Sequence, residues 1–177
     1  MSHRSGIAAL ATAASAILVA ALPALGFAAP SRDPARAARD AQPWATVNVC
    51  DTVGHPDGIG IRGSMPGTGD RRDELFMRIQ VQFRRPDGTW AGIGRAADSG
   101  FVDVGHGDAR VRQAGRTFTV MPPPIGRPAF VLRGLVTFDW RRDGQVERRV
   151  RRLTAPGHPD TPGADPADFS AATCSIR

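Results

Sequence analysis

The sequence predicts an all-β protein, a two-sheet antiparallel β-sandwich preceded by a signal peptide. The first observation is the strict alternation of apolar and polar side chains over residues 76–85, the period of two that a half-buried strand requires. The second is the recurrence of Gly, Pro and Asp turn signals at intervals of about ten to fifteen residues, which is typical of packed antiparallel sheets. The third is that no helical period of apolar residues follows the N-terminal segment.

Residues 1–28 predict a secretory signal peptide. Residues 7–25 are largely apolar after a basic start, and small residues at positions 26 and 28 fit the site that a signal peptidase recognises. An uncleaved membrane anchor is the alternative, because about 20 apolar residues can span a bilayer. Residues 29–43 are rich in Ala, Arg, Asp and Pro and predict a disordered leader. Residues 44–177 then form the β-sandwich domain, which is long enough to bury a core.

Two cysteines, Cys50 and Cys174, belong to a chain that is expected to enter an oxidising compartment, so a disulfide between them is the default expectation. Closing a loop of that length is worth about 4 to 5 kcal/mol in the chain-entropy model. In residues 44–52, however, Cys50 falls on the more polar face. Either a β-bulge shifts the register near Cys50, or the disulfide lies outside the main core.

About eight short strands are expected in the domain. In chain order, the strand-like segments are residues 44–52, 59–65, 76–85, 90–93, 101–104, 117–121, 130–141 and 145–153, and residues 169–176 close the chain with Ala172, Cys174 and Ile176 on one face. Residues 130–141 alternate as clearly as residues 76–85, and Trp140 lies on the apolar side of that segment. Residues 55–58 predict a turn, residues 105–116 a long polar connection and residues 154–168 an irregular tail.

The strand rhythm, the segment Phe138-Asp139-Trp140 and the closing segment FSAATCSIR resemble the immunoglobulin-like and fibronectin-type-III-like sandwiches of exported bacterial proteins. The resemblance covers residues 44–177. It implies an immunoglobulin-like β-sandwich fold for the domain.

The charge of the chain is positive and comes entirely from arginine. Removal of residues 1–28 leaves 22 arginines against 17 acidic residues, and the sequence contains neither lysine nor tyrosine. With abundant Ala, Gly and Pro, this composition is typical of a GC-rich bacterial genome. The positive excess favours anionic envelope polymers through a screened attraction. Nucleic acid is not an expected partner, because export removes it and no aromatic residues interleave with the arginines.

The candidate ligand-binding residues are Trp90, Arg149 and Arg151. Trp90 stands beside a predicted hairpin turn, where an indole can stack on a sugar ring. Arg149 and Arg151 lie in an arginine-rich strand and could hold phosphates or uronates by two-point hydrogen bonds. The alternative role for these arginines is to keep an edge strand from pairing with other sheets.

Three histidines, His55, His106 and His158, each follow a glycine and stand two residues before an aspartate. Imidazole and carboxylate groups bind zinc, so three such corners could form a metal site if they converge. The alternative is that Gly, His, Pro and Asp are turn residues here.

Residues 98–100 match the Asp-Ser-Gly core of the aspartic protease motif, whose paired carboxylates share a proton to activate water. A match of three residues occurs often by chance. A simple turn is therefore the expected meaning of this segment.

These observations predict a secreted, non-catalytic module of the bacterial cell envelope with a binding or structural role. The expected partner is an envelope polysaccharide or another envelope protein, with no cofactor, no nucleic acid and no membrane association after signal cleavage. One alternative is a module that binds carbohydrate or anionic polymer. The other is a metal-dependent hydrolase that uses the three histidine corners.

Overall fold

The computed structural model describes residues 42–177, so the predicted signal peptide and most of the predicted leader lie outside the described residues. Within residues 42–177, every regular element except the short 3-10 turn η1 (Arg95–Ala97) is a β-strand. The prediction of an all-β domain is therefore confirmed. No helix in this part of the chain is long and apolar enough to cross a membrane.

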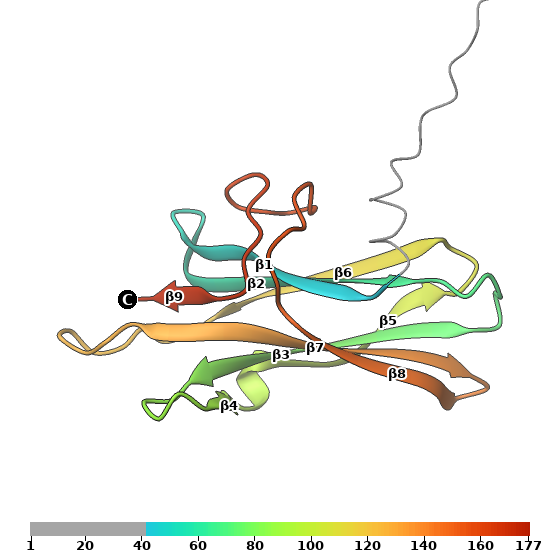
Figure 1. Ribbon diagram of the computed structural model, residues 1–177, viewed down its shortest axis with the longest axis horizontal. Coiled ribbons are helices and arrows are strands. Elements are labelled where there is room, and N and C mark those ends of the chain that lie inside the picture. The colour runs from blue at the N-terminus through green and yellow to red at the C-terminus, as the bar shows by residue number, and fades with distance from the viewer. Residues whose placement is uncertain (1–41) are drawn as a thin grey trace, which may run out of the picture. The chain divides into compact units, whose positions relative to one another are not determined.

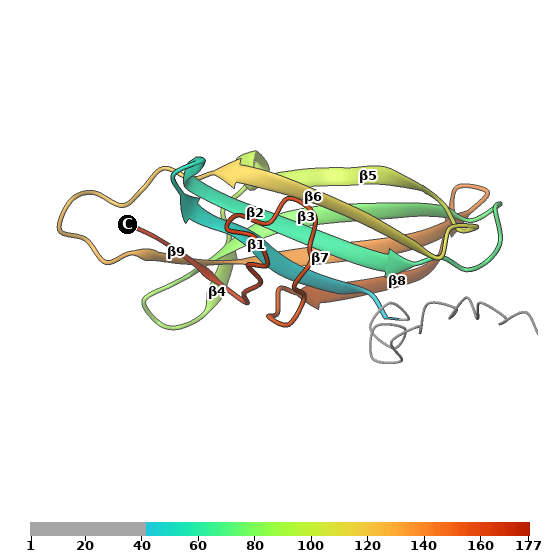
Figure 2. The same ribbon diagram turned by 90° about the horizontal axis from the view of Figure 1, so that it is seen from above.

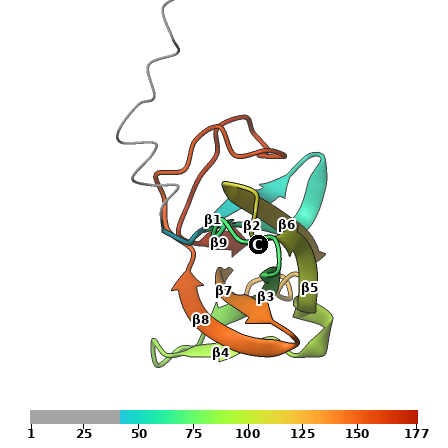
Figure 3. The same cartoon turned by 90° about the vertical axis from the view of Figure 1, so that its right-hand side faces the viewer.

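The strands form two antiparallel sheets. They are β1 (Trp44–Thr52), β2 (His55–Pro66), β3 (Glu74–Arg84), β4 (Trp90–Gly92), β5 (Asp98–His106), β6 (Val111–Thr119), β7 (Phe130–Arg142), β8 (Gln145–Leu153) and β9 (Cys174–Ile176). The smaller sheet has the order β1-β2-β6. In the larger sheet β3 pairs with β7 at the centre, β4 and β5 pair with β3, and β8 and β9 pair with β7 (Figure 1). Figure 3, which looks along the strands, shows the two sheets as separate layers.

The core lies between the two sheets and follows the predicted alternation. Met77, Ile79 and Val81 of β3 are buried, and so are Leu132 and Phe138 of β7. Successive side chains of a strand point to opposite faces, so the polar residues between them are turned outward. The predicted inner faces of β3 and β7 are confirmed.

A glycine on β7 lets the two sheets approach closely. A Cβ atom placed on Gly134 would lie 2.7 Å from Cγ2 of Thr154 and 2.8 Å from Cδ1 of Ile61, closer than side-chain carbons approach. Ile61 belongs to the opposite sheet. The packing of Ile61 against β7 therefore depends on the absence of a side chain at position 134.

The predicted disulfide between Cys50 and Cys174 is present, with 5.3 Å between the Cα atoms. It joins β1 of the smaller sheet to β9 of the larger one. The register of β1 shifts between Val47 and Val49 and again between Cys50 and Thr52, as β-bulges require. Cys174 is buried in the core and Cys50 packs against it. Of the two alternatives, the bulge is the one that the structure contains.

The segment between β8 and β9 covers the outer face of β1. Asn48 donates a hydrogen bond from Nδ2 to the carbonyl oxygen of Gly163 (3.0 Å), and Thr46 shares one with Ser170 (2.8 Å between the hydroxyl oxygens). The backbone groups of Val47 bond with those of Ala171 in both directions. Thr46 and Asn48 are therefore buried although they alternate with the core residues of β1, because residues 154–173 supply their hydrogen-bond partners (Figures 1 and 2).

Several expectations about local structure are wrong, including the turn expected at residues 98–100, which belong to β5. Residues 55–58 belong to β2 rather than to a turn, and β9 is limited to Cys174–Ile176, because residues 169–173 lie along β1. Residues 105–116 contain the end of β5 and most of β6 rather than a connection. β6 is an edge strand that pairs along its length with β2, so its backbone hydrogen bonds hold it in place without an alternating apolar pattern.

Candidate functional site

The outer surface of the larger sheet carries a concentration of arginines, which we call the arginine face. It consists of Arg78 on β3, Arg133 and Arg141 on β7, and Arg149 and Arg151 on β8. The arginines on β3 and β7 stand at the positions that alternate with buried apolar residues. The cross-strand register then brings them close to acidic and aromatic residues of the neighbouring strands.

Asp139 is the anion at the centre of the arginine face, and its side chain is 0% exposed. Arg149 donates two hydrogen bonds of 2.6 Å to its two carboxylate oxygens, and Arg141 donates a third of 2.9 Å to Oδ2. Burial alone raises the pKa of Asp139, but the hydrogen bonds from Arg149 and Arg141 outweigh it and hold the pKa below its usual range. The carboxylate is therefore charged and shared by two guanidinium groups.

A second ion pair joins Arg78 to Asp98 on the neighbouring strand β5. Arg78 donates from Nε to Oδ1 (2.9 Å) and from Nη2 to Oδ2, and Gln80 also donates to Oδ2 (3.1 Å). The hydrogen bond from Arg78 is the main cause that lowers the pKa of Asp98. Gly100 donates its backbone N–H to the same carboxylate. Asp98 therefore neutralises an arginine at the start of β5, and residues 98–100 belong to this strand and not to the simple turn that the sequence predicted.

Two phenylalanine rings support the paired arginines. The guanidinium carbon of Arg141 lies 4.1 Å from the ring centroid of Phe76 and 4.8 Å from that of Phe101. Arg149 and Arg78 lie 5.3 Å and 5.9 Å from the same Phe101 ring. These distances are within the range of cation–π attraction. The rings and the carboxylates together hold these three guanidinium groups in defined positions.

Arg133 is held differently, because no carboxylate among residues 42–177 pairs with it. Its guanidinium lies 4.1 Å from the ring centroid of Trp90, and its Nε donates a hydrogen bond of 2.9 Å to Gln82. Burial lowers the pKa of Arg133, although an arginine keeps its charge in proteins. Stacking and one hydrogen bond thus orient the group and leave its two terminal nitrogens available to a ligand. Arg133 also covers one face of the indole on which a sugar was expected to stack.

A groove of about 300 Å³ lies beside this stack, between β3 and the segment that connects β4 to β5. The amides of Gln80 and Gln82 line it, together with Arg95 and Asp98. The groove therefore offers both donors and acceptors, and it shares Gln82 with the hydrogen bond that holds Arg133.

The three predicted ligand-binding residues all lie on or near the arginine face, but in different states. Trp90 supports Arg133, and Arg149 is engaged with Asp139. Arg151 is exposed and forms no ion pair within the described chain. β8 is also an edge strand, which agrees with the alternative role of its arginines.

The sequence interpretation did not single out Arg78 and Arg133. Each stands at an outward position of one of the two most clearly alternating strands. An arginine at such a position on both central strands of one sheet is the signal that could have identified them.

The three histidines do not form a metal site. His55 begins β2, and His106 ends β5 near residues that bond to the segment after β2. β2 spans about 35 Å, so His55 at its start and His106 near the segment that follows its end lie far apart. His158 stacks on Trp44 with 4.0 Å between the ring centroids. Within residues 42–177, no group of three or more His, Cys, Asp and Glu residues could hold a metal ion.

Comparison of the chain with protein-family models, with curated protein sequences and with solved structures finds no match in any of the three.

Proposed function

We propose that this chain is an exported, immunoglobulin-like β-sandwich module of the bacterial cell envelope that binds an anionic polymer on its arginine face. The observation that carries the proposal is the state of Arg133, a guanidinium held by Trp90 and Gln82 with no carboxylate partner among the described residues. An arginine oriented in this way loses little freedom when it binds a carboxylate or a phosphate in a two-point contact.

The distribution of charge favours a polymer over a small anion. Three arginines of the face are paired with Asp98 and Asp139, whereas Arg133 and Arg151 have no such partner in residues 42–177. Arg151 pairs with Thr137, four residues along β7 from Arg133, so the two groups start about 14 Å apart. A small anion can contact one of them. A chain with repeated negative charges can contact both and gains affinity from the second contact.

The disulfide supports export, since such bonds persist in oxidising compartments. Polyuronates and phosphate-containing polymers of the envelope have the required chemistry. A neutral polysaccharide is expected to bind this surface more weakly, because Arg133 occupies one face of the Trp90 ring on which a sugar would stack.

The test is binding of the purified, disulfide-intact protein to polygalacturonate, measured by isothermal titration calorimetry. Arg133→Gln and Arg151→Gln are each expected to weaken binding by about tenfold, the loss of one charge-assisted contact. Arg71→Gln is the matched control, because Arg71 is an exposed arginine in the turn before β3. It should change binding by less than about twofold, the effect of one screened surface charge.

Two further ligands complete the experiment. Galacturonate monomer should bind far more weakly than the polymer, and a neutral glucan should not compete. The proposal is wrong if the neutral glucan binds as tightly as polygalacturonate, or if Arg133→Gln and Arg151→Gln bind like the unchanged protein.

A further inference from the structure

A pocket of about 580 Å³ lies at one end of the larger sheet, and we call it the loop-end pocket. Its walls are the β3–β4 turn and the start of β7 with the loop that precedes it. Figures 1 and 2 both show this turn and the β6–β7 loop at the same end of the two sheets. The pocket shares no lining residue with the groove beside Arg133.

The floor of the loop-end pocket is apolar. Its apolar lining residues are Phe83, Pro86, Pro128, Ala129, Phe130 and Val131. Phe130 is 37% exposed although it is a large aromatic residue at the start of β7. A concave apolar surface that remains in contact with water is suited to the hydrocarbon part of a ligand.

Three arginines, Arg84, Arg85 and Arg127, surround this apolar floor, and no acidic residue lines the pocket. In the described structure, the guanidinium groups of Arg84 and Arg127 form no hydrogen bond or ion pair, and Arg85 has one weak contact of 3.4 Å to Thr89. Most arginines of the arginine face, by contrast, are paired with carboxylates. The loop-end pocket therefore combines apolar lining residues with two arginines, Arg84 and Arg127, that no carboxylate among the described residues pairs with.

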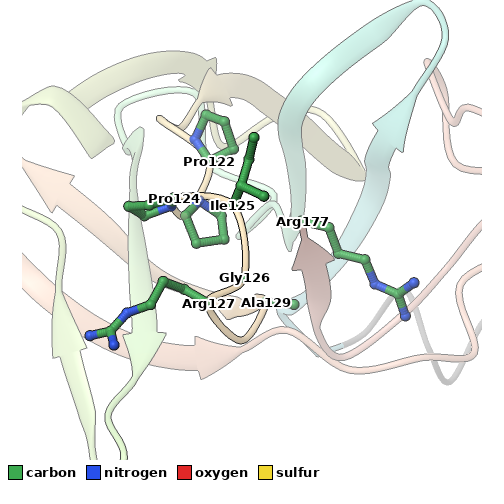
Figure 4. Close-up of a pocket in the computed structure, with 8 residues that line it drawn as sticks. Pro122, Pro124, Ile125, Gly126, Arg127, Ala129 and Arg177 are labelled. Carbon is green, nitrogen blue, oxygen red and sulfur yellow. The ribbon is translucent and has the colours of Figure 1, made fainter.

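The loop that carries Arg127 is stiffened by proline. Pro122, Pro123 and Pro124 precede it and Pro128 follows, and each ring fixes its own φ angle. The backbone N–H of Arg127 bonds to the carbonyl oxygen of Pro124 at 3.0 Å, which closes a turn. Figure 4 shows Arg127 extending away from Arg177 on the other side of this loop. The pocket drawn in Figure 4 is a neighbouring one on this loop, and Arg127 lines both that pocket and the loop-end pocket.

We propose that the loop-end pocket binds a single-chain amphiphilic anion, an alkyl chain that ends in a carboxylate. The chain covers the apolar floor formed by Phe83, Phe130 and the prolines, and the carboxylate accepts hydrogen bonds from Arg84 and Arg127. The pocket is lined by none of the five arginines of the arginine face, and its existence does not depend on binding of a polymer there.

The test uses decanoate below the concentration at which it forms micelles, with binding to the disulfide-intact protein followed by calorimetry. Acetate supplies the carboxylate without the chain, and 1-decanol supplies the chain without the charge. Decanoate is expected to bind at least about tenfold more tightly than either, since each lacks one of the two contacts. This comparison needs no variant and so does not depend on whether a variant folds.

Binding measurements on variants then test whether decanoate binds in the loop-end pocket. Arg84→Gln and Arg127→Gln should each weaken decanoate binding by about fivefold to tenfold, whereas Arg71→Gln should have less than about a twofold effect. Arg151→Gln should leave decanoate binding unchanged, because Arg151 belongs to the arginine face but pairs with Thr137, six positions along β7 from the pocket residue Val131. The proposal is overturned if 1-decanol binds as tightly as decanoate, or if Arg84→Gln and Arg127→Gln bind decanoate like the unchanged protein.

Discussion

Arg149 holds the buried carboxylate of Asp139 across the β7–β8 ladder through two hydrogen bonds, from Nε to Oδ1 and from Nη2 to Oδ2, each 2.6 Å long. Arg141 approaches the same carboxylate from its own strand and lies over the ring of Phe76. An anion thus lies inside a surface that is otherwise rich in arginine. This arrangement fixes the guanidinium groups of Arg141 and Arg149. Arg133 and Arg151 have no carboxylate partner among the described residues.

Replacement of Asp139 should be the most damaging single change on the arginine face. Asp139→Asn keeps the shape of the side chain but leaves Arg141 and Arg149 without their shared anion. We expect the free energy of unfolding to fall by about 2 to 4 kcal/mol, somewhat less than for a fully enclosed pair because both arginines reach solvent. Urea unfolding measures the change. Asp143→Asn, a matched change in an exposed turn, should cost less than about 0.5 kcal/mol, and an equal loss in both variants would contradict the prediction.

Acid should destabilise the protein through its paired carboxylates. Hydrogen bonds from Arg78 lower the pKa of Asp98, and a hydrogen bond from Thr68 lowers that of Asp73. The pKa of each carboxyl is lower in the folded than in the unfolded protein, where it is near 4. Each carboxyl therefore contributes its full stabilisation at pH values above the unfolded-state pKa, and this contribution is lost as the pH falls through the folded-state pKa. The free energy of unfolding, measured in urea at several pH values, should therefore fall from about pH 5 downward. The decline should be shallower in Asp98→Asn, and a protein that gains stability on acidification would rule out this account.

The disulfide should contribute a large share of the stability. Cys50 and Cys174 are 124 positions apart, and a loop of this size is worth about 4 to 5 kcal/mol in the chain-entropy model, of which proteins often realise less. The double variant Cys50→Ser, Cys174→Ser should lose about 2 to 5 kcal/mol in urea unfolding. The oxidised protein treated with a reductant serves as the comparison and should behave like the double variant. Unchanged unfolding midpoints in both samples would show that the bond does not stabilise the fold.

The hydroxyl of Thr154 should anchor the segment that covers β1. Its Oγ1 accepts a hydrogen bond from the backbone N–H of Gly134 (3.0 Å) and donates one to the carbonyl oxygen of Ala172 (2.6 Å). Thr154→Val keeps the shape of the side chain but leaves both backbone groups without this partner, at a cost of about 1 to 3 kcal/mol. The exposed Thr173→Val is the matched control and should be neutral in the same thermal or urea unfolding experiment. A neutral Thr154→Val would show that water replaces the hydroxyl.

Arg62 should be replaceable with no loss of stability. Its Nε is buried with no hydrogen-bond partner among the described residues, and burial lowers the pKa of its guanidinium. Arg62→Met keeps the apolar stem and removes a buried donor that is not satisfied, so we expect the free energy of unfolding to rise by up to about 1 to 2 kcal/mol. Calorimetric unfolding decides the sign. A loss of stability would show that Arg62 has a stabilising contact that outweighs the unsatisfied donor.

Part of the candidate site could be predicted because it depends on local sequence. Trp90 stands beside a hairpin turn. Arg149 and Arg151 lie in the strand that directly follows the Asp143-Gly144 turn. The role of Arg133 could not be predicted, because Trp90 is 43 positions away and reaches it through the pairing of β4, β3 and β7. The same reason explains the wrong interpretation of residues 105–116, where pairing with β2 creates a strand that has no pattern of its own.

The sequence by itself determined the all-β class, the inner faces of β3 and β7 and the pairing of the two cysteines. Each of these follows from a period of two or from the number of cysteines, which can be counted along the chain. Only the tertiary structure decided which arginines are neutralised and which are not. Arg142 meets Asp73 across 69 positions and Asn48 meets Gly163 across 115, because sheet register joins segments whose separation in sequence carries no information about their contact.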